Sequence, residues 1–236
     1  MVNVSGKANA DGDIMVATAN GGDYDGFLKC FMDQGSVESR RYYLCRKTVF
    51  EMLNDRGYNV PESELTRSLD QFRAEFGQHP DLDFLRIRVP LRSDPSNKIL
   101  VIFLGTSEIN IKTIRGIYGQ IMNKETLKRL ILIVQSKMTS YSRKELQKYP
   151  FQVEIFKMGD LLVNIARHVL QPKYGVLTAH EKLVLLTKLK IEEKQLPHML
   201  ETDAIARYYG LEKGKVLKVT FNGQLVDDHV TYRCVV

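Results

Sequence analysis

The sequence predicts an α/β fold in which a βαβ portion is followed by a smaller α+β portion. Two continuous apolar runs, 99–104 and 130–134, have the composition of strands that are covered on both faces. Helical periodicity lies between them and again before the apolar segment 152–156, and this order implies parallel pairing through right-handed crossovers. The alternation stops after Asp160, so we place a domain boundary near Val163.

Two helices and a strand are expected before the apolar runs. Apolar residues recur every three or four positions in 36–56 and in 65–76, and a glycine follows each segment. Residues 84–89 alternate apolar side chains with arginines, and Pro90 ends this strand.

Two crossover helices are expected in the βαβ portion. Apolar side chains at helical spacing mark the first helix at 114–121. The second follows Thr139 or Ser140, either of which can accept a hydrogen bond from a free N–H of the first turn, and it runs to Lys148.

The C-terminal portion should contain two capped helices and two strands. Residues 164–173 have the pattern of a strand or extended chain, and Thr178 with Glu181 forms a capping box. A short helix follows from Thr202 or Asp203 and ends at a glycine, Gly210, which takes the left-handed position readily.

Strands are then expected at 216–221 and 230–236. We prefer a longer loop between them, 222–228, over a tight Asn-Gly hairpin, because two aspartates would otherwise enter the return strand.

Residues 1–36 are expected to form a disordered extension. They hold six of the 16 glycines, two lysines against five aspartates, and no sustained period. Ordering such a segment costs more conformational entropy than its burial returns. The predicted division is therefore 1–36, 37–163 and 164–236.

Composition predicts a mildly basic protein of a reducing compartment. The net charge is +6 at pH 7, and residues 137–190 hold ten basic against four acidic side chains. Three distant cysteines argue for free thiols. No apolar run reaches transmembrane length and no signal pattern opens the chain, so we expect a cytosolic or nuclear protein without a membrane partner.

The residue patterns offer no catalytic or metal site, and we expect no cofactor. Neither glycine-rich phosphate motif occurs, since only Gly105 follows the run 99–104. A magnesium-dependent nuclease needs carboxylates on adjacent strands, but 99–104 carries no charge. Glu154 and Lys157 are one residue too far apart for the Asp/Glu-x-Lys pair, and the five histidines lack neighbours at metal-ligand spacing.

Five segments occur in the order of one known family: RKTVFEMLNDRGY (46–58), NIARHVLQPKYGVLTAHEK (164–182), QLP (195–197), RYYGLEKGKV (207–216) and VTYR (230–233). They resemble the fifth subunit of eukaryotic nuclear DNA-directed RNA polymerases, whose C-terminal domain is similar to a small protein of archaeal RNA polymerase. The stretches RRYYLCRKTVFEML, EEKQLP and HVTYRCV are most similar to the plant paralogue used by RNA polymerase V.

The resemblance implies a jaw domain with a nuclease-like scaffold (37–163) and a small assembly domain (164–236). It implies a non-catalytic nuclear subunit, acting with RNA polymerase V in RNA-directed DNA methylation and gene silencing. The alternatives are the subunit shared by RNA polymerases I, II and III and, outside this family, a divergent magnesium-dependent nuclease. The implied partners are the largest subunit, other polymerase subunits and, weakly, downstream duplex DNA.

A basic set follows the second buried strand, at the sheet edge where α/β proteins bind ligands, and the resemblance brings this loop near DNA. Backbone attraction is the expected role, and a solvated charged face is the alternative. The DNA-proximal set comprises Lys137, Thr139, Ser140, Arg143, Lys144 and Lys148.

The subunit interface implied by the resemblance comprises His168, Pro172, Lys173, Leu196, Pro197, Arg207, Tyr208, Tyr209 and Arg233. For Arg207 and the two tyrosines, core and interface remain open. Consecutive helical residues point in different directions, so we expect at least one of these tyrosines to be exposed in the isolated domain. For His168 we favour a hydrogen-bonded structural histidine.

Overall fold

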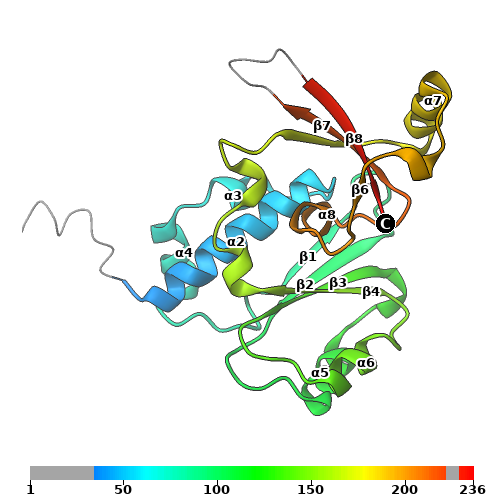
Figure 1. Ribbon diagram of the computed structural model, residues 1–236. Coiled ribbons are helices and arrows are strands. Elements are labelled where there is room, and N and C mark those ends of the chain that lie inside the picture. The colour runs from blue at the N-terminus through cyan, green and yellow to red at the C-terminus, as the bar shows by residue number, and fades with distance from the viewer. Residues whose placement is uncertain (1–34, 222–228) are drawn as a thin grey trace, which may run out of the picture. The chain divides into compact units, whose positions relative to one another are not determined.

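The computed structural model describes residues 35–221 and 229–236 (Figure 1). The disordered extension predicted for 1–36 falls almost wholly outside these residues, and so does the loop predicted at 222–228. Both therefore stay predictions. Residues Val37–Val236 form one unit of contacts that includes two sheets, and the domain boundary near Val163 also stays a prediction.

The first sheet has four strands in the order β1-β2-β3-β4 (Figure 1). β2 (Lys98–Phe103), β3 (Leu127–Val134) and β4 (Gln152–Lys157) are parallel, and β1 (Ile87–Pro90) pairs antiparallel with β2. The predicted α/β class and the parallel centre of the sheet are confirmed.

Helices cover both faces of this sheet, which explains its two apolar strands. α2 (Val37–Asp55) and α4 (Leu69–Phe76) contribute to the core on one face. α5 (Ile111–Gln120) and α6 (Ser140–Leu146) contribute to the core on the other. Successive residues of β2 alternate between the two cores, since a strand turns every second side chain to the same face.

Two predicted boundaries in the N-terminal portion are wrong. The helix predicted at 65–76 is two helices, α3 (Glu62–Thr66) and α4, because Ser68 and Gln71 form a capping box that begins a new helix. The strand predicted from 84 begins at 87. The Asp81 carboxylate accepts a hydrogen bond from the N–H of Asp83 at 3.0 Å, which holds the residues between Asp81 and β1 in a turn.

The second sheet has the order β5-β7-β8-β6. β5 (Lys173–Val176) and β8 (His229–Val235) pair antiparallel with β7 (Val216–Phe221), and β6 (His198–Met199) pairs parallel with β8. The prediction of a strand or extended chain at 164–173 is wrong over most of its length, because β5 begins only at Lys173. The start of this segment is a 3-10 turn, in which the Asn164 side chain accepts a hydrogen bond from the N–H of Ala166.

Two helices accompany the second sheet. α7 (Ala179–Leu189) begins at the predicted capping box, and α8 (Ala204–Tyr209) is capped by the Asp203 carboxylate. Gly210 ends α8 in the left-handed conformation, with φ 60°. Short 3-10 turns complete the described chain at Lys124–Thr126, Met158–Leu161, Ile165–Arg167 and Glu193–Gln195.

We expect Gly210→Ala to destabilise the protein by about 1–3 kcal/mol, because an L residue is strained in this conformation. The added Cβ would also lie 2.7 Å from Nη1 of Arg129 and 2.9 Å from Cζ of Arg56. Urea unfolding would measure the loss. The matched control is Gly116→Ala in the interior of α5, where a Cβ meets nothing within 4 Å. That change should stabilise the protein by up to about 1 kcal/mol, and equal losses in both variants would contradict this account.

Candidate functional site

Glu154 of β4 is held between two arginines. Its carboxylate accepts hydrogen bonds at 3.1 and 2.7 Å from Arg56, which directly follows α2, and at 3.1 Å from Arg129 of β3. The Arg56 side chain is 3% exposed and the Glu154 side chain 14%. Burial by itself raises the pKa of Glu154, but the two guanidinium groups outweigh it and hold that pKa below its usual value.

The same two arginines bind the end of α8. Arg56 donates hydrogen bonds to the carbonyls of Arg207 at 2.7 Å and Tyr208 at 2.8 Å, and Arg129 donates to the carbonyl of Gly210 at 3.0 Å. The last carbonyls of a helix have no partner within the helix, and guanidinium groups satisfy them well. One carboxylate therefore orients two arginines that fix α8 against the first sheet.

Tyr208 is core, so the expectation that it faces a partner is wrong. It is 3% exposed, its hydroxyl donates to Asp55 at 2.9 Å, and it accepts from the amide of Asn164 at 3.1 Å. Burial raises the pKa of its hydroxyl. Tyr209 is half-buried, so neither tyrosine is fully exposed within the whole chain.

Leu196 is also core, being 5% exposed in a small cluster with Val216 and Cys234. Of the other predicted interface residues, His168, Lys173, Pro197 and Arg233 are exposed, and Pro172 and Arg207 are half-buried. Nδ1 of His168 accepts a hydrogen bond from the N–H of Leu170 at 3.2 Å. The interface role of these residues stays a prediction.

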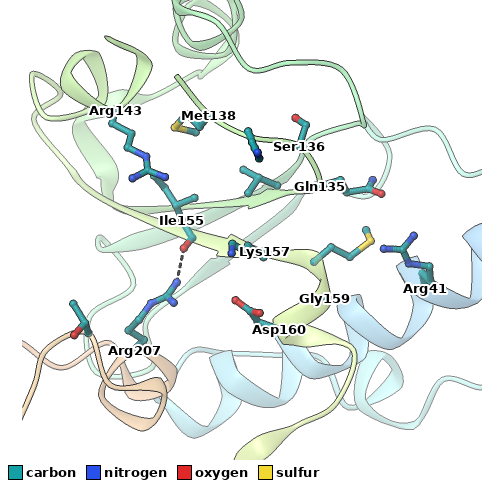
Figure 2. A pocket seen from close by; sticks show the side chains of 14 residues that line it. Arg41, Gln135, Ser136, Met138, Arg143, Ile155, Lys157, Gly159, Asp160 and Arg207 are labelled. Carbon is teal, nitrogen blue, oxygen red and sulfur yellow. Dashed lines mark hydrogen bonds between the residues drawn. The ribbon is translucent and has the colours of Figure 1, made fainter. Parts of the chain in front are cut away.

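A basic cleft of about 940 Å³ lies at the carboxyl ends of β3 and β4. Side chains from α2, the β3–α6 connection, α6, β4 and α8 line it (Figure 2). Five are cationic and one is anionic: Arg41, Lys137, Arg143, Lys157 and Arg207, with Asp160. This is the edge at which open α/β sheets bind ligands.

The cations of the cleft have no ion-pair partners among the described residues. Within residues 35–221 and 229–236, none of the five forms an ion pair. Arg207 donates a hydrogen bond to the carbonyl of Ile155 (Figure 2), and its guanidinium lies 4.5 Å from the centre of the Phe156 ring. These contacts fix Arg207 in place at the wall of the cleft. Because five cations line the cleft against one carboxylate, the cleft attracts anions.

The predicted DNA-proximal residues divide into four groups. Lys137 and Arg143 line the cleft, and Lys144 is exposed on α6 outside it. Lys148 is paired with Glu145 at 2.9 Å, and so is Arg115. The hydrogen bond from Arg115 is the chief reason that the pKa of Glu145 is lowered.

The last two members of the set lie at the start of α6. The Thr139 hydroxyl accepts a hydrogen bond from the N–H of Ser142 at 3.2 Å and therefore serves as the helix cap. Ser140 is exposed in the first turn. Proximity to DNA stays a prediction for all six residues.

Sequence reasoning missed Arg41, Lys157 and the pairing of Glu154. The rule that directed attention to the end of β3 also applies to β4, whose last residue is Lys157. The Glu154 ion pairs had no comparable signal, because Arg56 and Glu154 are 98 residues apart in the chain.

A magnesium-dependent nuclease needs a free carboxylate on the strands of the first sheet. Glu154 is the carboxylate that these strands offer, and it is already bound by two guanidinium groups. No group of three or more His, Cys, Asp or Glu side chains suited to a metal ion occurs in the part of the chain that the structure describes. Among the same residues, no helix is long and apolar enough to cross a membrane.

The fold and the cleft identify a two-sheet α/β protein whose candidate site is a cleft lined by cationic side chains. The family models for RNA polymerase Rpb5 match residues 36–121 (N-terminal domain) and 163–235 (C-terminal domain). The chain therefore belongs to the Rpb5 family of RNA polymerase subunits, and the predicted resemblance is confirmed.

Known members of the family are similar over most of this chain. The DNA-directed RNA polymerase V subunit 5C of Arabidopsis thaliana is 51% identical, over 86% of this chain and 88% of its own. Subunit 5A of polymerase V from the same plant is 46% identical, over 88% and 94%. The RPABC1 subunit of RNA polymerases I, II and III from Caenorhabditis elegans is 35% identical, over 87% and 100%.

We expect Glu154→Gln to lower the free energy of unfolding by about 3 kcal/mol at neutral pH, because it leaves the buried Arg56 guanidinium without its carboxylate and removes one of the two carboxylates paired with Arg129. A carboxylate with a lowered pKa stabilises the fold above its unfolded pKa of about 4.3, and this contribution is lost as the pH falls through the folded value. The difference between wild type and variant should therefore shrink below about pH 4.

The control is Glu212→Gln, which removes the other carboxylate paired with Arg129. Glu212 is 55% exposed, so its loss should cost less than about 1 kcal/mol. Urea unfolding between pH 3 and 8 would give the free energy of unfolding as a function of pH for wild type and for the two variants. A pH-independent gap between wild type and Glu154→Gln would show that the ion pairs are not the cause.

Proposed function

We propose that this chain is a non-catalytic subunit of a plant RNA polymerase V, acting in the nucleus in RNA-directed DNA methylation and gene silencing. The observation that carries the proposal is its identity of 46–51% with three subunits of that polymerase, across at least 86% of the chain. One of these relatives is named for polymerases IV and V together. The partners would be other subunits of the polymerase.

The shared subunit of RNA polymerases I, II and III is the second candidate. Its representatives from Caenorhabditis elegans and Dictyostelium discoideum are 35% identical over 80–87% of the chain. They have the same family architecture, so the fold does not separate the two candidates. The difference in identity favours polymerase V.

An accessory role fits the chemistry of the site. The carboxylate on β4 is occupied by Arg56 and Arg129, and the parallel strands at the centre of the sheet are lined by apolar side chains. The charge in the cleft is cationic, which suits binding to anions rather than metal-assisted hydrolysis.

The C-terminal portion has the surface of an anchor for the largest subunit. Eight of the fourteen large apolar side chains that are exposed in the described residues fall between 163 and 200. Val169 is 95% exposed and Leu170 is 86% exposed, directly before β5. Where exposed apolar side chains gather into one patch, they mark protein–protein interfaces. This surface is where we place the contact with the largest subunit.

The basic surface around the start of α6 would lie beside downstream duplex DNA. Lys137 and Lys144 are exposed near the start of α6 and have no acidic partner among residues 35–221 and 229–236. Lysines in this arrangement act on phosphates through charge, without reading bases.

Expression of the tagged chain in Arabidopsis thaliana, followed by affinity purification and mass spectrometry of the co-purifying proteins, tests the assignment. The largest subunit of polymerase V should be enriched at least about tenfold over those of polymerases I, II and III, which corresponds to a difference of about 1.4 kcal/mol in binding. Equal enrichment of the polymerase II subunit would favour the second candidate instead.

A variant carrying Val169→Asp and Leu170→Asp tests the anchor in the same experiment. Both side chains are exposed, so the protein should fold, and recovery of every largest subunit should fall. The matched control is Phe84→Asp, which changes a 74% exposed apolar residue outside the anchor and should leave recovery unchanged.

We expect neutralisation of Lys137 and Lys144 to flatten the salt dependence with which the assembled polymerase holds downstream DNA. Each lost phosphate contact should reduce the log–log slope by about one unit, so Lys137→Gln with Lys144→Gln should remove about two. Lys148→Gln is the control, since Glu145 already pairs with that ammonium group. An unchanged slope in the double variant would make both lysines ordinary solvated surface.

A further inference from the structure

A small apolar pocket opens beside the basic cleft. Its volume is about 260 Å³, and its lining includes Phe156, Leu161, Ile165 and Tyr208. Val163 lines the same pocket and is 67% exposed, so the pocket is open to solvent. Apolar surface left open in this way gains free energy when a bulky apolar group fills it.

The pocket and the cleft share a wall. Arg207 and Asp160 line both spaces. Figure 2 shows Arg207 hydrogen-bonded to the carbonyl of Ile155, and Asp160 among the other residues that line the cleft. Because its guanidinium also lies over Phe156, Arg207 presents charge to the cleft and covers an apolar ring at the same time. One ligand can therefore occupy the two spaces together.

The ligand that fits must carry several negative charges and one bulky apolar group. The five cations of the cleft lie on separate elements and outnumber its single carboxylate. Duplex DNA would supply the charge, but it keeps its bases stacked and offers no side chain to the pocket. An extended peptide supplies both, because neighbouring side chains along it point in different directions.

We propose that the basic cleft and the apolar pocket together bind an acidic peptide segment that carries a bulky apolar residue. The cations attract its carboxylates, and the apolar side chain enters the space between Leu161, Val163 and Tyr208. The site lies between β4, α2 and α8, so occupation depends on the position of α8 that Arg56 and Arg129 hold.

Fluorescence anisotropy with the purified full chain tests the proposal. The probe is a fluorescein-labelled decapeptide of eight aspartates around a central Phe-Leu pair, and the comparison peptide has Ala-Ala at the centre. The Phe-Leu peptide should bind at least about tenfold more tightly, as expected when a large apolar side chain is buried. A version with asparagine in place of every aspartate should not bind measurably.

Two variants separate the parts of the site. Arg41→Glu with Lys157→Glu should weaken both acidic peptides at least about tenfold, because it reverses two cations of the cleft. Val163→Asp should remove the preference for Phe-Leu while leaving the affinity for the Ala-Ala peptide within about twofold. The altered side chains are exposed, so both proteins should unfold at the wild-type urea concentration. Lys144→Glu is the matched control, since it reverses an exposed lysine that lines neither space.

Equal affinity for the Phe-Leu and Ala-Ala peptides would overturn the proposal, and so would an effect of Lys144→Glu as large as that of the cleft variant. A 20-base-pair duplex is the competing probe. If it binds more tightly than the Phe-Leu peptide and loses the same affinity in Arg41→Glu with Lys157→Glu, the cleft is a phosphate-binding surface instead. These results leave the assignment to polymerase V untouched, because that assignment is tested by co-purification.

Discussion

The ion pairs of Glu154 fix the contact between the first sheet and α8, which accompanies the second sheet. The two carboxylate oxygens of Glu154 orient Arg56 and Arg129, and those arginines satisfy the last carbonyls of α8. A buried ion pair gains little over a well-packed apolar alternative, but losing one partner is costly. The network therefore acts chiefly by positioning α8, since its two arginines bind three carbonyls at the end of that helix.

The basic cleft follows from that placement. The carboxyl ends of β3 and β4 supply Lys137 and Lys157, while α8 contributes Arg207 from the C-terminal portion. Tyr208 reinforces the arrangement, because it belongs to the core under α2 although it lies beyond residue 200 in the chain. The cleft is thus a product of both portions, and neither portion alone would present its full set of cations.

The fold could be predicted well from the sequence because its signals are local. The apolar runs of β2 and β3, the capping box at Thr178 and the glycine that ends α8 each depend on residues a few positions apart. The errors also have local causes. A capping box at Ser68 divides one expected helix, and the turn stabilised by Asp81 shortens an expected strand.

The candidate site was only partly predictable, because it depends on distant residues. The end of β3 was expected to bind a ligand on topological grounds, and Lys137 and Arg143 do line the cleft. Burial of Tyr208 and Leu196 could not be anticipated, since the local pattern suits core and interface equally. The second half of the cleft required knowledge of where α8 packs.

The hydrogen bonds from Arg56 to α8 also bear on how the chain folds. Their partners are 151 and 152 residues apart, so a very long loop must close before these bonds form. Proteins rich in contacts of such long range fold more slowly than proteins whose contacts are local. Because the entropy of closing such a loop is lost before the contact stabilises the chain, the hydrogen bonds between Arg56 and α8 favour slow folding.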